Sequence, residues 1–113
     1  MEKALIRGIL VTPNWGPEEV EFEDDFRNIQ RLVEGHFEMP AFFPDVDIIV
    51  NEEGKFNGST ANVSLYYKGR LFDVIYGNIL IVDSDDEGNT ISLSDEKFEK
   101  YWKIFSKSSV KLA

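Results

Sequence analysis

The sequence contains no cysteine and only one histidine, His36. Without a thiolate the chain has no disulfide, no finger-type zinc site, no iron–sulfur cluster and no cysteine nucleophile. A single imidazole cannot build a metal site of two or three histidines, and any Ser/His/Asp triad would have to use that one residue. Because His36 directly follows Gly35, which we expect to end a helix, we interpret it as a structural or half-exposed residue.

Long hydrophobic runs and phosphate-binding motifs are also missing. No stretch approaches the roughly 18 apolar residues of a membrane span, and no cleavage site follows the short apolar run near the N-terminus. The sequence therefore predicts a soluble, cytoplasmic protein that binds no membrane. The eight glycines are dispersed, so there is no glycine-rich phosphate loop, and no G-x-S-x-G nucleophile elbow is present. We expect a protein that is not an enzyme and holds no cofactor.

What the chain does contain is enough apolar material for one hydrophobic core. Of its 113 residues, 42% are hydrophobic and 13% aromatic. This length and composition are typical of a single globular domain. We place that domain at residues 1–107, followed by a C-terminal tail at residues 108–113.

The charge is strongly acidic and unevenly distributed. Twenty-one acids against 12 bases give a net charge of -9 at pH 7, which repels nucleic acid and favours a protein partner with a basic surface. Six of the eight residues 18–25 and four of the five residues 83–87 are acidic. The candidate partner-binding residues are the acids of both runs and one loop tryptophan: Glu18, Glu19, Glu21, Glu23, Asp24, Asp25, Asp83, Asp85, Asp86, Glu87 and Trp15.

Each of these features also has a purely structural interpretation. Acidic runs are commonly solvated loops and helix N-termini, and Trp15 is either an exposed contact residue or folded back over the core. The spacing Asp83-x-Asp85-x-Glu87-Gly88 is similar to the start of a calcium loop, but Ser94 stands where the twelfth-position glutamate would be. We interpret this segment as an acidic hairpin turn without a metal.

The first half of the chain predicts two strands and a helix. Residues 4–11 form an apolar, β-branched run typical of a central or near-central strand. Val20 and Phe22 alternate with glutamates, which indicates a half-exposed strand in a hairpin with the first. Asp24 or Asp25 should then cap a short helix whose apolar residues recur at helical spacing, with Gly35 in the left-handed position at its end. That apolar stripe comprises Phe26, Ile29, Leu32 and Val33.

The second half predicts further strands. Short strands are expected within residues 36–43 and 46–50, followed by a tight hairpin turn with a positive φ at Gly54. Val63, Leu65 and Tyr67 alternate as a strand would. Residues 71–82 carry the strongest strand signal, and Gly77-Asn78 should bulge or redirect it.

The last helix has the clearest pattern. Ser92 and Asp95 have capping-box spacing, and we interpret the aromatic stripe as core rather than as a partner groove. Ion pairs are expected four residues apart, between Glu96 and Lys100 and between Glu99 and Lys103. Together these elements predict an α+β fold: a mostly antiparallel sheet with about two helices covering one face. The aromatic stripe of this last helix comprises Phe98, Tyr101, Trp102 and Phe105.

Three segments carry a family resemblance. They are residues 51–55 (Asn-Glu-Glu-Gly-Lys), residues 72–82, which contain Asp-Val-Ile-Tyr-Gly, and residues 93–96 before the aromatic helix. With these segments the chain, from residue 3 to residue 105, resembles a family of small bacterial proteins of unknown function carried by phages, plasmids and conjugative elements. The family has no assigned catalytic residues, and the resemblance implies an accessory protein of a mobile element.

Charge and resemblance together favour a non-enzymatic acidic binding protein. Its carboxylates would occupy a basic nucleic-acid-binding surface, such as the channel of a restriction or CRISPR nuclease, and so block a host defence. One alternative is a small enzyme that uses clustered carboxylates, with or without a divalent cation. The other is a structural or regulatory accessory protein whose acidity serves solubility.

Overall fold

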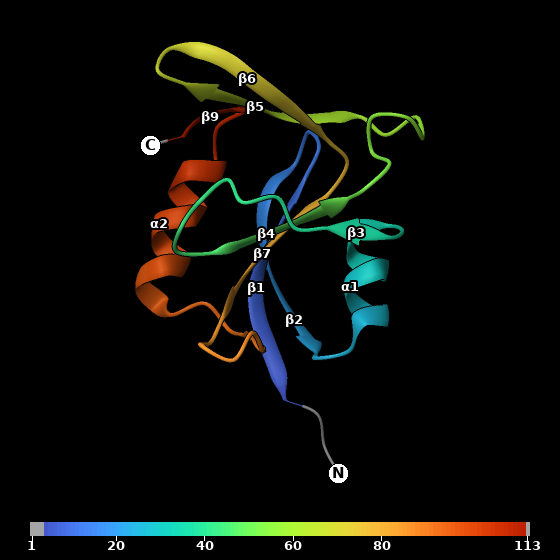
Figure 1. Ribbon diagram of the computed structural model, residues 1–113, viewed down its shortest axis with the longest axis vertical. Coiled ribbons are helices and arrows are strands. Elements are labelled where there is room, and N and C mark those ends of the chain that lie inside the picture. Colours follow the sequence, from blue (N-terminus) through green and yellow to red (C-terminus); the bar gives the residue numbers. More distant parts are fainter. Residues whose placement is uncertain (1–3, 113) are drawn as a thin grey trace.

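Nine β-strands and two α-helices form the computed structural model, which describes residues 4–112 (Figure 1). The fold is α+β with mostly antiparallel strands, as the sequence predicts. Neither helix within the described chain has the length and apolar run that a membrane crossing requires. The elements are β1 (Leu5–Thr12), β2 (Gly16–Glu23), α1 (Phe26–Val33), β3 (Phe37–Glu38), β4 (Asp47–Asn51), β5 (Ala61–Tyr67), β6 (Arg70–Tyr76), β7 (Ile79–Ser84), β8 (Thr90–Ile91), α2 (Asp95–Phe105) and β9 (Ser109–Leu112).

The strands form two sheets instead of the one expected. The larger sheet has the order β2-β1-β7-β4-β3, with β8 paired to β7, and the smaller has the order β6-β5-β9. The segment predicted as one interrupted strand supplies β6 to the small sheet and β7 to the large one. Gly77 makes this change of direction with φ +84°, and the Asn78 side chain donates to the Leu32 carbonyl at 2.9 Å. The predicted redirection is therefore confirmed, and it separates the two sheets.

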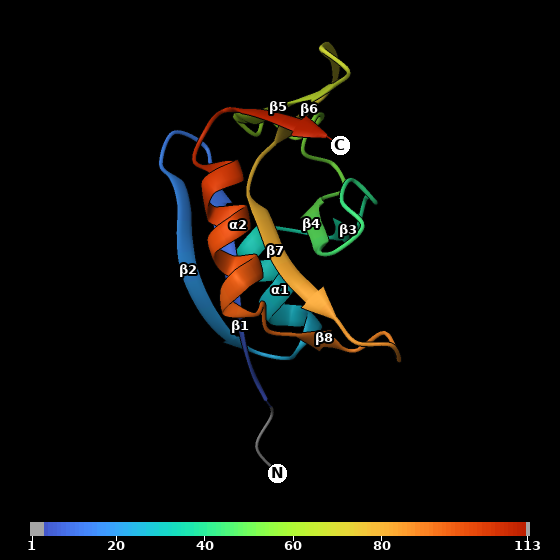
Figure 2. The same cartoon turned by 90° about the vertical axis from the view of Figure 1, so that its left-hand side faces the viewer.

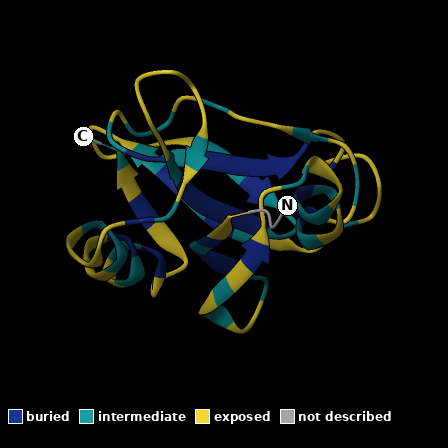
Figure 3. Cartoon of the chain, turned by 90° about the horizontal axis from the view of Figure 1, so that it is seen from below, coloured by how far each residue is buried: buried dark blue, intermediate teal, exposed yellow. Residues whose placement is uncertain are grey.

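The two helices lie on opposite faces of the larger sheet, not on one face as expected (Figures 1 and 2). Alternate residues of β1 explain this, because Ile9 faces the α2 side and Leu10 faces the α1 side. The central strands β1, β7 and β4 are apolar on both faces, so each face needs a helix to cover it. Figure 3 shows these buried strands between the two helices.

Helix α1 begins as predicted and ends differently. Asp25 caps it by accepting a hydrogen bond from the Arg27 amide at 2.9 Å. The left-handed residue at the end is Glu34 (φ 65°), not Gly35. Gly35 is required for another reason: it has φ +154°, and a Cβ there would lie 2.7 Å from the Asn51 amide nitrogen. Phe26 leaves the predicted apolar stripe and is 61% exposed, since it is the first residue after the cap.

The hairpin expected around Gly54 is absent from the described fold. Residues 52–58 are a series of turns that carries the chain from β4 in the large sheet to β5 in the small one. Gly54 is not among the positive-φ residues. Its missing Cβ matters because a side chain would begin 2.6 Å from the Tyr76 carbonyl oxygen. The glycine thus permits a close approach of two backbones.

Helix α2 has the predicted aromatic core but another cap. Ser94 is the N-cap and accepts from the Lys97 amide at 3.1 Å, whereas Ser92 accepts from the Arg7 amide at 2.8 Å. Ser92 lies two residues before this cap, and its hydroxyl instead joins the loop to β1. Of the two predicted ion pairs, only the one between Glu99 and Lys103 forms.

The cation expected to pair with Glu96 has another partner. Lys100 pairs with Asp45 in the loop before β4, at 3.0 Å.

The residues assigned to a C-terminal tail also take part in the fold. Ser109–Leu112 forms β9, which runs parallel to β5 and buries Val110.

Candidate functional site: an acidic edge strand with exposed tryptophan

Strand β2 lies at the edge of the larger sheet and carries the first acidic run. It pairs with β1 along its whole length, with Leu5 opposite Glu23 and Thr12 opposite Gly16. Phe22 is buried and Val20 packs on the α1 side, so Glu19, Glu21 and Glu23 project on the α2 side. The prediction of a half-exposed strand with an acidic face is confirmed.

One arginine neutralises part of this face. The guanidinium of Arg7 on β1 pairs with Glu19 and with Asp95 at 2.9 Å, and it lies 3.9 Å above the ring of Phe98. Its hydrogen bond with Glu19 raises the pKa of Arg7. Glu18, Glu21 and Glu23 are exposed and have no salt bridge to any residue within 4–112. Within residues 4–112 these three carboxylates have no cationic partner, so they can attract an external cation.

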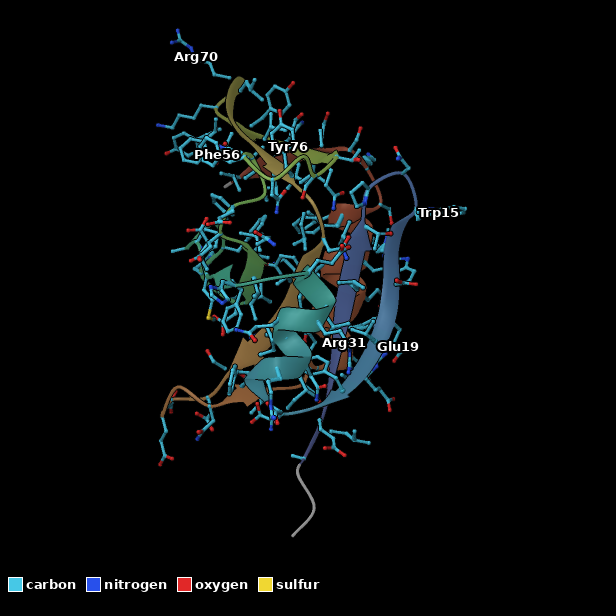
Figure 4. The ribbon with its side chains drawn as sticks, turned by 90° about the vertical axis from the view of Figure 1, so that its right-hand side faces the viewer. Trp15, Glu19, Arg31, Phe56, Arg70 and Tyr76 are labelled. Atoms are coloured by element: carbon cyan, nitrogen blue, oxygen red, sulfur yellow. The ribbon has the colours of Figure 1, made fainter. Side chains whose placement is uncertain are left out.

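Trp15 extends from the end of this strand. It lies in the turn between β1 and β2, flanked by Asn14 (φ 72°) and Gly16 (φ 77°), both left-handed. The side chain is 89% exposed and points away from the body of the protein (Figure 4). Of the two interpretations that the sequence left open, the structure shows the exposed one.

A shallow aromatic groove runs between β2 and α2. Phe98 and Trp102 stack at 5.6 Å with their rings 24° apart. A cavity of about 310 Å³ is lined by these rings and Glu19, and a second of about 440 Å³ extends from Trp102 to Trp15. The groove therefore connects the exposed tryptophan with the acidic strand. We call the combined area the β2 surface, defined by Trp15, Glu19, Glu21, Glu23, Phe98 and Trp102.

The remaining acids of the first run flank this surface. Glu18 projects on the α1 side of β2. Asp24 is exposed after the strand ends, and Asp25 is engaged as the cap of α1. His36 lies apart from the β2 surface and is exposed, with Nδ1 3.5 Å from a Glu52 carboxylate oxygen.

The second acidic run does not join the β2 surface. It forms the hairpin between β7 and β8, which Figure 2 shows on the opposite side of the molecule from β2. Asp83 pairs with Lys97 at 2.7 Å. Asp85 closes the turn by accepting from the Asn89 and Glu87 amides, each at 2.9 Å, and these bonds, chiefly those from Asn89, lower the pKa of Asp85. The two remaining acids, Asp86 and Glu87, are exposed.

Carboxylates from one loop and from strands β4 and β7 meet in a separate cavity of about 360 Å³ lined by Asp45, Asp47, Asp83 and Lys97. Burial favours the neutral form of Asp45, but hydrogen bonds from Tyr101 and Lys100 outweigh it and lower the pKa of Asp45. A carboxylate with a lowered pKa stays ionised and is a poor general acid near neutral pH. Among residues 4–112, no group of three or more His, Asp or Glu side chains could hold a metal ion.

Sequence reasoning missed Asp45, Phe98 and Trp102 as parts of these two sites. Asp45 lies 56 positions from Tyr101, so no local spacing connects them. Phe98 and Trp102 were correctly assigned to the helix stripe. They are only partly buried because they lie beside Glu19 on the edge strand β2, a position that no sequence period encodes.

Fold and site together define a small acidic α+β protein whose edge strand β2 carries exposed carboxylates, with exposed Trp15 at its start and the partly buried rings of Phe98 and Trp102 beside it on α2. Its sequence matches a domain of unknown function, DUF3846, over residues 6–106, and the chain belongs to that family. No curated protein and no solved structure matches it. The family resemblance is therefore confirmed as membership of an uncharacterised family.

Proposed function

We propose that this protein is a non-enzymatic acidic binding protein whose β2 surface occupies a basic surface of a protein partner. The observation that carries the proposal is that Glu21 and Glu23 are exposed, with no ion pair to residues 4–112, and that exposed Trp15 lies at the end of the same strand. Carboxylates supply electrostatic attraction and orientation. An exposed tryptophan supplies the large apolar contact that interface hot spots favour.

Protection of the sheet edge explains the glutamates of β2 but not the exposed Trp15. Charged side chains on an edge strand prevent unwanted pairing with other chains, and the glutamates of β2 meet that need. Trp15 has the opposite effect, because an indole that is 89% exposed adds apolar surface that favours association with another molecule. A binding role explains both features together.

The proposed partner class rests on the net charge and on the resemblance to small proteins of mobile elements. A basic nucleic-acid channel presents Arg and Lys side chains to phosphates, and a row of carboxylates can replace those phosphates. We take the protein to be an accessory factor of a phage or other mobile element that blocks such a channel in a restriction or CRISPR nuclease. Its net charge of -9 opposes direct binding to nucleic acid.

The first experiment measures binding of the purified full chain to restriction nucleases and CRISPR effector complexes at low and high salt. Tight binding at low salt that weakens steeply as salt is added is expected, because the attraction is screened. Competition by duplex DNA should displace the protein from the nuclease. Absence of binding to every nuclease at low salt would contradict the proposal.

A matched pair of charge reversals then locates the surface. The double variant Glu21→Lys/Glu23→Lys should weaken binding at least about tenfold, which corresponds to roughly 1.4 kcal/mol. The control Asp86→Lys/Glu87→Lys makes the same change in net charge on the far hairpin and should have a smaller effect. Trp15→Ala should raise the dissociation rate. Equal weakening by both double variants would show that overall charge, and not the β2 surface, drives binding.

A further inference from the structure

The free edges of the two sheets differ in how they are protected against pairing. On β2 the exposed side chains are mostly glutamates. On β6, which pairs only with β5 within the described chain, the exposed residues include Leu71 and Phe72, at 58% and 59% exposed. An apolar, uncovered edge strand readily accepts another strand. The β6 edge is therefore a pairing surface unless something covers it.

Further aromatic side chains extend the apolar area beside β6. Phe56, in the loop between β4 and β5, is 88% exposed. Phe42, before β4, meets Phe72 edge to face at 6.3 Å. All three line a mainly apolar cavity of about 510 Å³, the largest of the cavities described in this structure. We call Leu71, Phe72, Phe56 and Phe42 the β6 surface.

The charges along β6 change sign from one end to the other. Lys68 and Arg70 are exposed at the tip of the β5–β6 hairpin, and Glu52 and Glu53 are exposed in the loop at its base. The close approach of Gly54 to the Tyr76 carbonyl places this acidic loop beside the end of β6. Figure 4 shows Arg70 at the tip and Phe56 and Tyr76 near the base.

The middle of the strand carries no free charge. Asp73 is the one acidic residue within β6, and it pairs with Lys55 from the same loop. The β6 surface thus has an apolar centre, a basic end and an acidic end. A surface with this layout is complementary to itself after a two-fold rotation.

We propose that β6 pairs antiparallel with β6 of a second copy of this chain, forming an isologous dimer. β6 is irregular at Phe72, because Asp73 pairs with Leu65 and Leu71 pairs with Tyr66 on β5. A two-fold axis at this point sets Arg70 beside Val74 of the partner subunit and directs the turn that carries Lys68 toward the far end of the partner's β6. The basic tip of each copy then meets the acidic loop of the other, and the exposed phenylalanines are covered at the centre. Backbone pairing and burial of aromatic area act together.

A second copy fits this edge better than a uniformly basic partner does. Such a partner would be attracted at Glu52 and Glu53 but repelled at Lys68 and Arg70, whereas the same chain satisfies both ends. The dimer leaves the β2 surface free, since Trp15 and Glu19 lie on the other side of the molecule from Arg70 (Figure 4). The inference therefore does not depend on the proposed binding function.

Sedimentation equilibrium of the full chain over a range of concentrations tests the dimer. The expected result is a reversible rise in mass from 13.0 kDa to twice that value. Phe72→Glu should shift the equilibrium to monomer, while Phe26→Glu should not. Phe26 is a matched control because it is 61% exposed, close to the 59% of Phe72, and lies on α1.

A charge exchange provides the second test and does not depend on how well Phe72→Glu folds. Arg70→Glu alone should weaken the dimer at least about tenfold, since it places like charges together at both ends. Adding Glu52→Arg and Glu53→Arg in the same chain should restore it. A monomer at every concentration, a dimer indifferent to Phe72→Glu and Arg70→Glu, or failure of the exchange to restore association would overturn the proposal.

Discussion

Tyr101 shows how a single polar contact fixes a buried aromatic residue. Its ring is buried and lies edge to face against Phe43 at 5.2 Å, while its hydroxyl donates to Asp45. Burial, followed by this bond to a carboxylate, raises the pKa of Tyr101, so the hydroxyl remains a donor. The carboxylate is held in turn by Lys100 at 3.0 Å. Three residues from two distant segments thereby join α2 to the loop before β4.

Tyr101→Phe should lower the free energy of unfolding by about 1 kcal/mol at pH 7, the usual value for one lost hydrogen bond. The pKa of folded Asp45 lies below its ordinary value of 3.8, so its contribution is present above that pH and is lost as pH falls through the lower folded value. The difference between wild type and variant should therefore shrink below pH 3.8 in urea titrations. Tyr67→Phe, which removes the hydroxyl of an exposed tyrosine, is the control. A difference that stayed constant with pH would contradict this account.

At the scale of elements, patterns that depend on near neighbours predicted the structure well. The alternation in β2 and the helical stripe that buries Tyr101 and Phe105 both follow from one buried face per element. The sequence failed where a partner from elsewhere decides the outcome. Ser92 has the right spacing for a cap but bonds to β1, and Gly54 is explained by a strand about twenty residues later along the chain.

The N-cap of α2 provides a direct test of this distinction. Ser94→Ala should destabilise the protein by about 1 kcal/mol, because the Lys97 amide loses its acceptor. Ser94→Asp should retain most of the stability, since aspartate is an equally good cap. Thermal and urea unfolding measure both. An unfolding free energy unchanged in Ser94→Ala would show that Ser94 is not the effective cap.

At the scale of the whole molecule, the candidate site could be predicted only in part. The first acidic run and Trp15 were identified from the sequence, and the structure places them on one edge. The run at Asp83–Glu87 could not be separated from them beforehand, because its position depends on the order of β1 and β7 in the sheet. The β6 surface was not foreseen, since the strand signal over residues 71–82 does not show which side chains an edge position leaves exposed.

The two proposed surfaces should act independently. Phe72→Glu should leave the intrinsic affinity of the β2 surface for an immobilised basic partner unchanged within about twofold, because the substitution lies on the other sheet. Because Phe72→Glu disrupts the proposed dimer, it should also abolish the extra affinity that a dimer gains by binding two immobilised partner molecules at high density. Surface plasmon resonance at low and high density measures both effects. A large loss of affinity at low density would show that the surfaces are coupled.

The pairing of β1 with β7 also governs how fast the chain can reach its native state. Ile9 and Ile81 are direct partners in the middle of the larger sheet, although roughly seventy positions of sequence separate them, so a long loop must close before this contact forms. Proteins dominated by such distant pairings refold in milliseconds to seconds. The β1–β2 and β5–β6 hairpins can assemble early, but cooperative folding must wait until β1 meets β7.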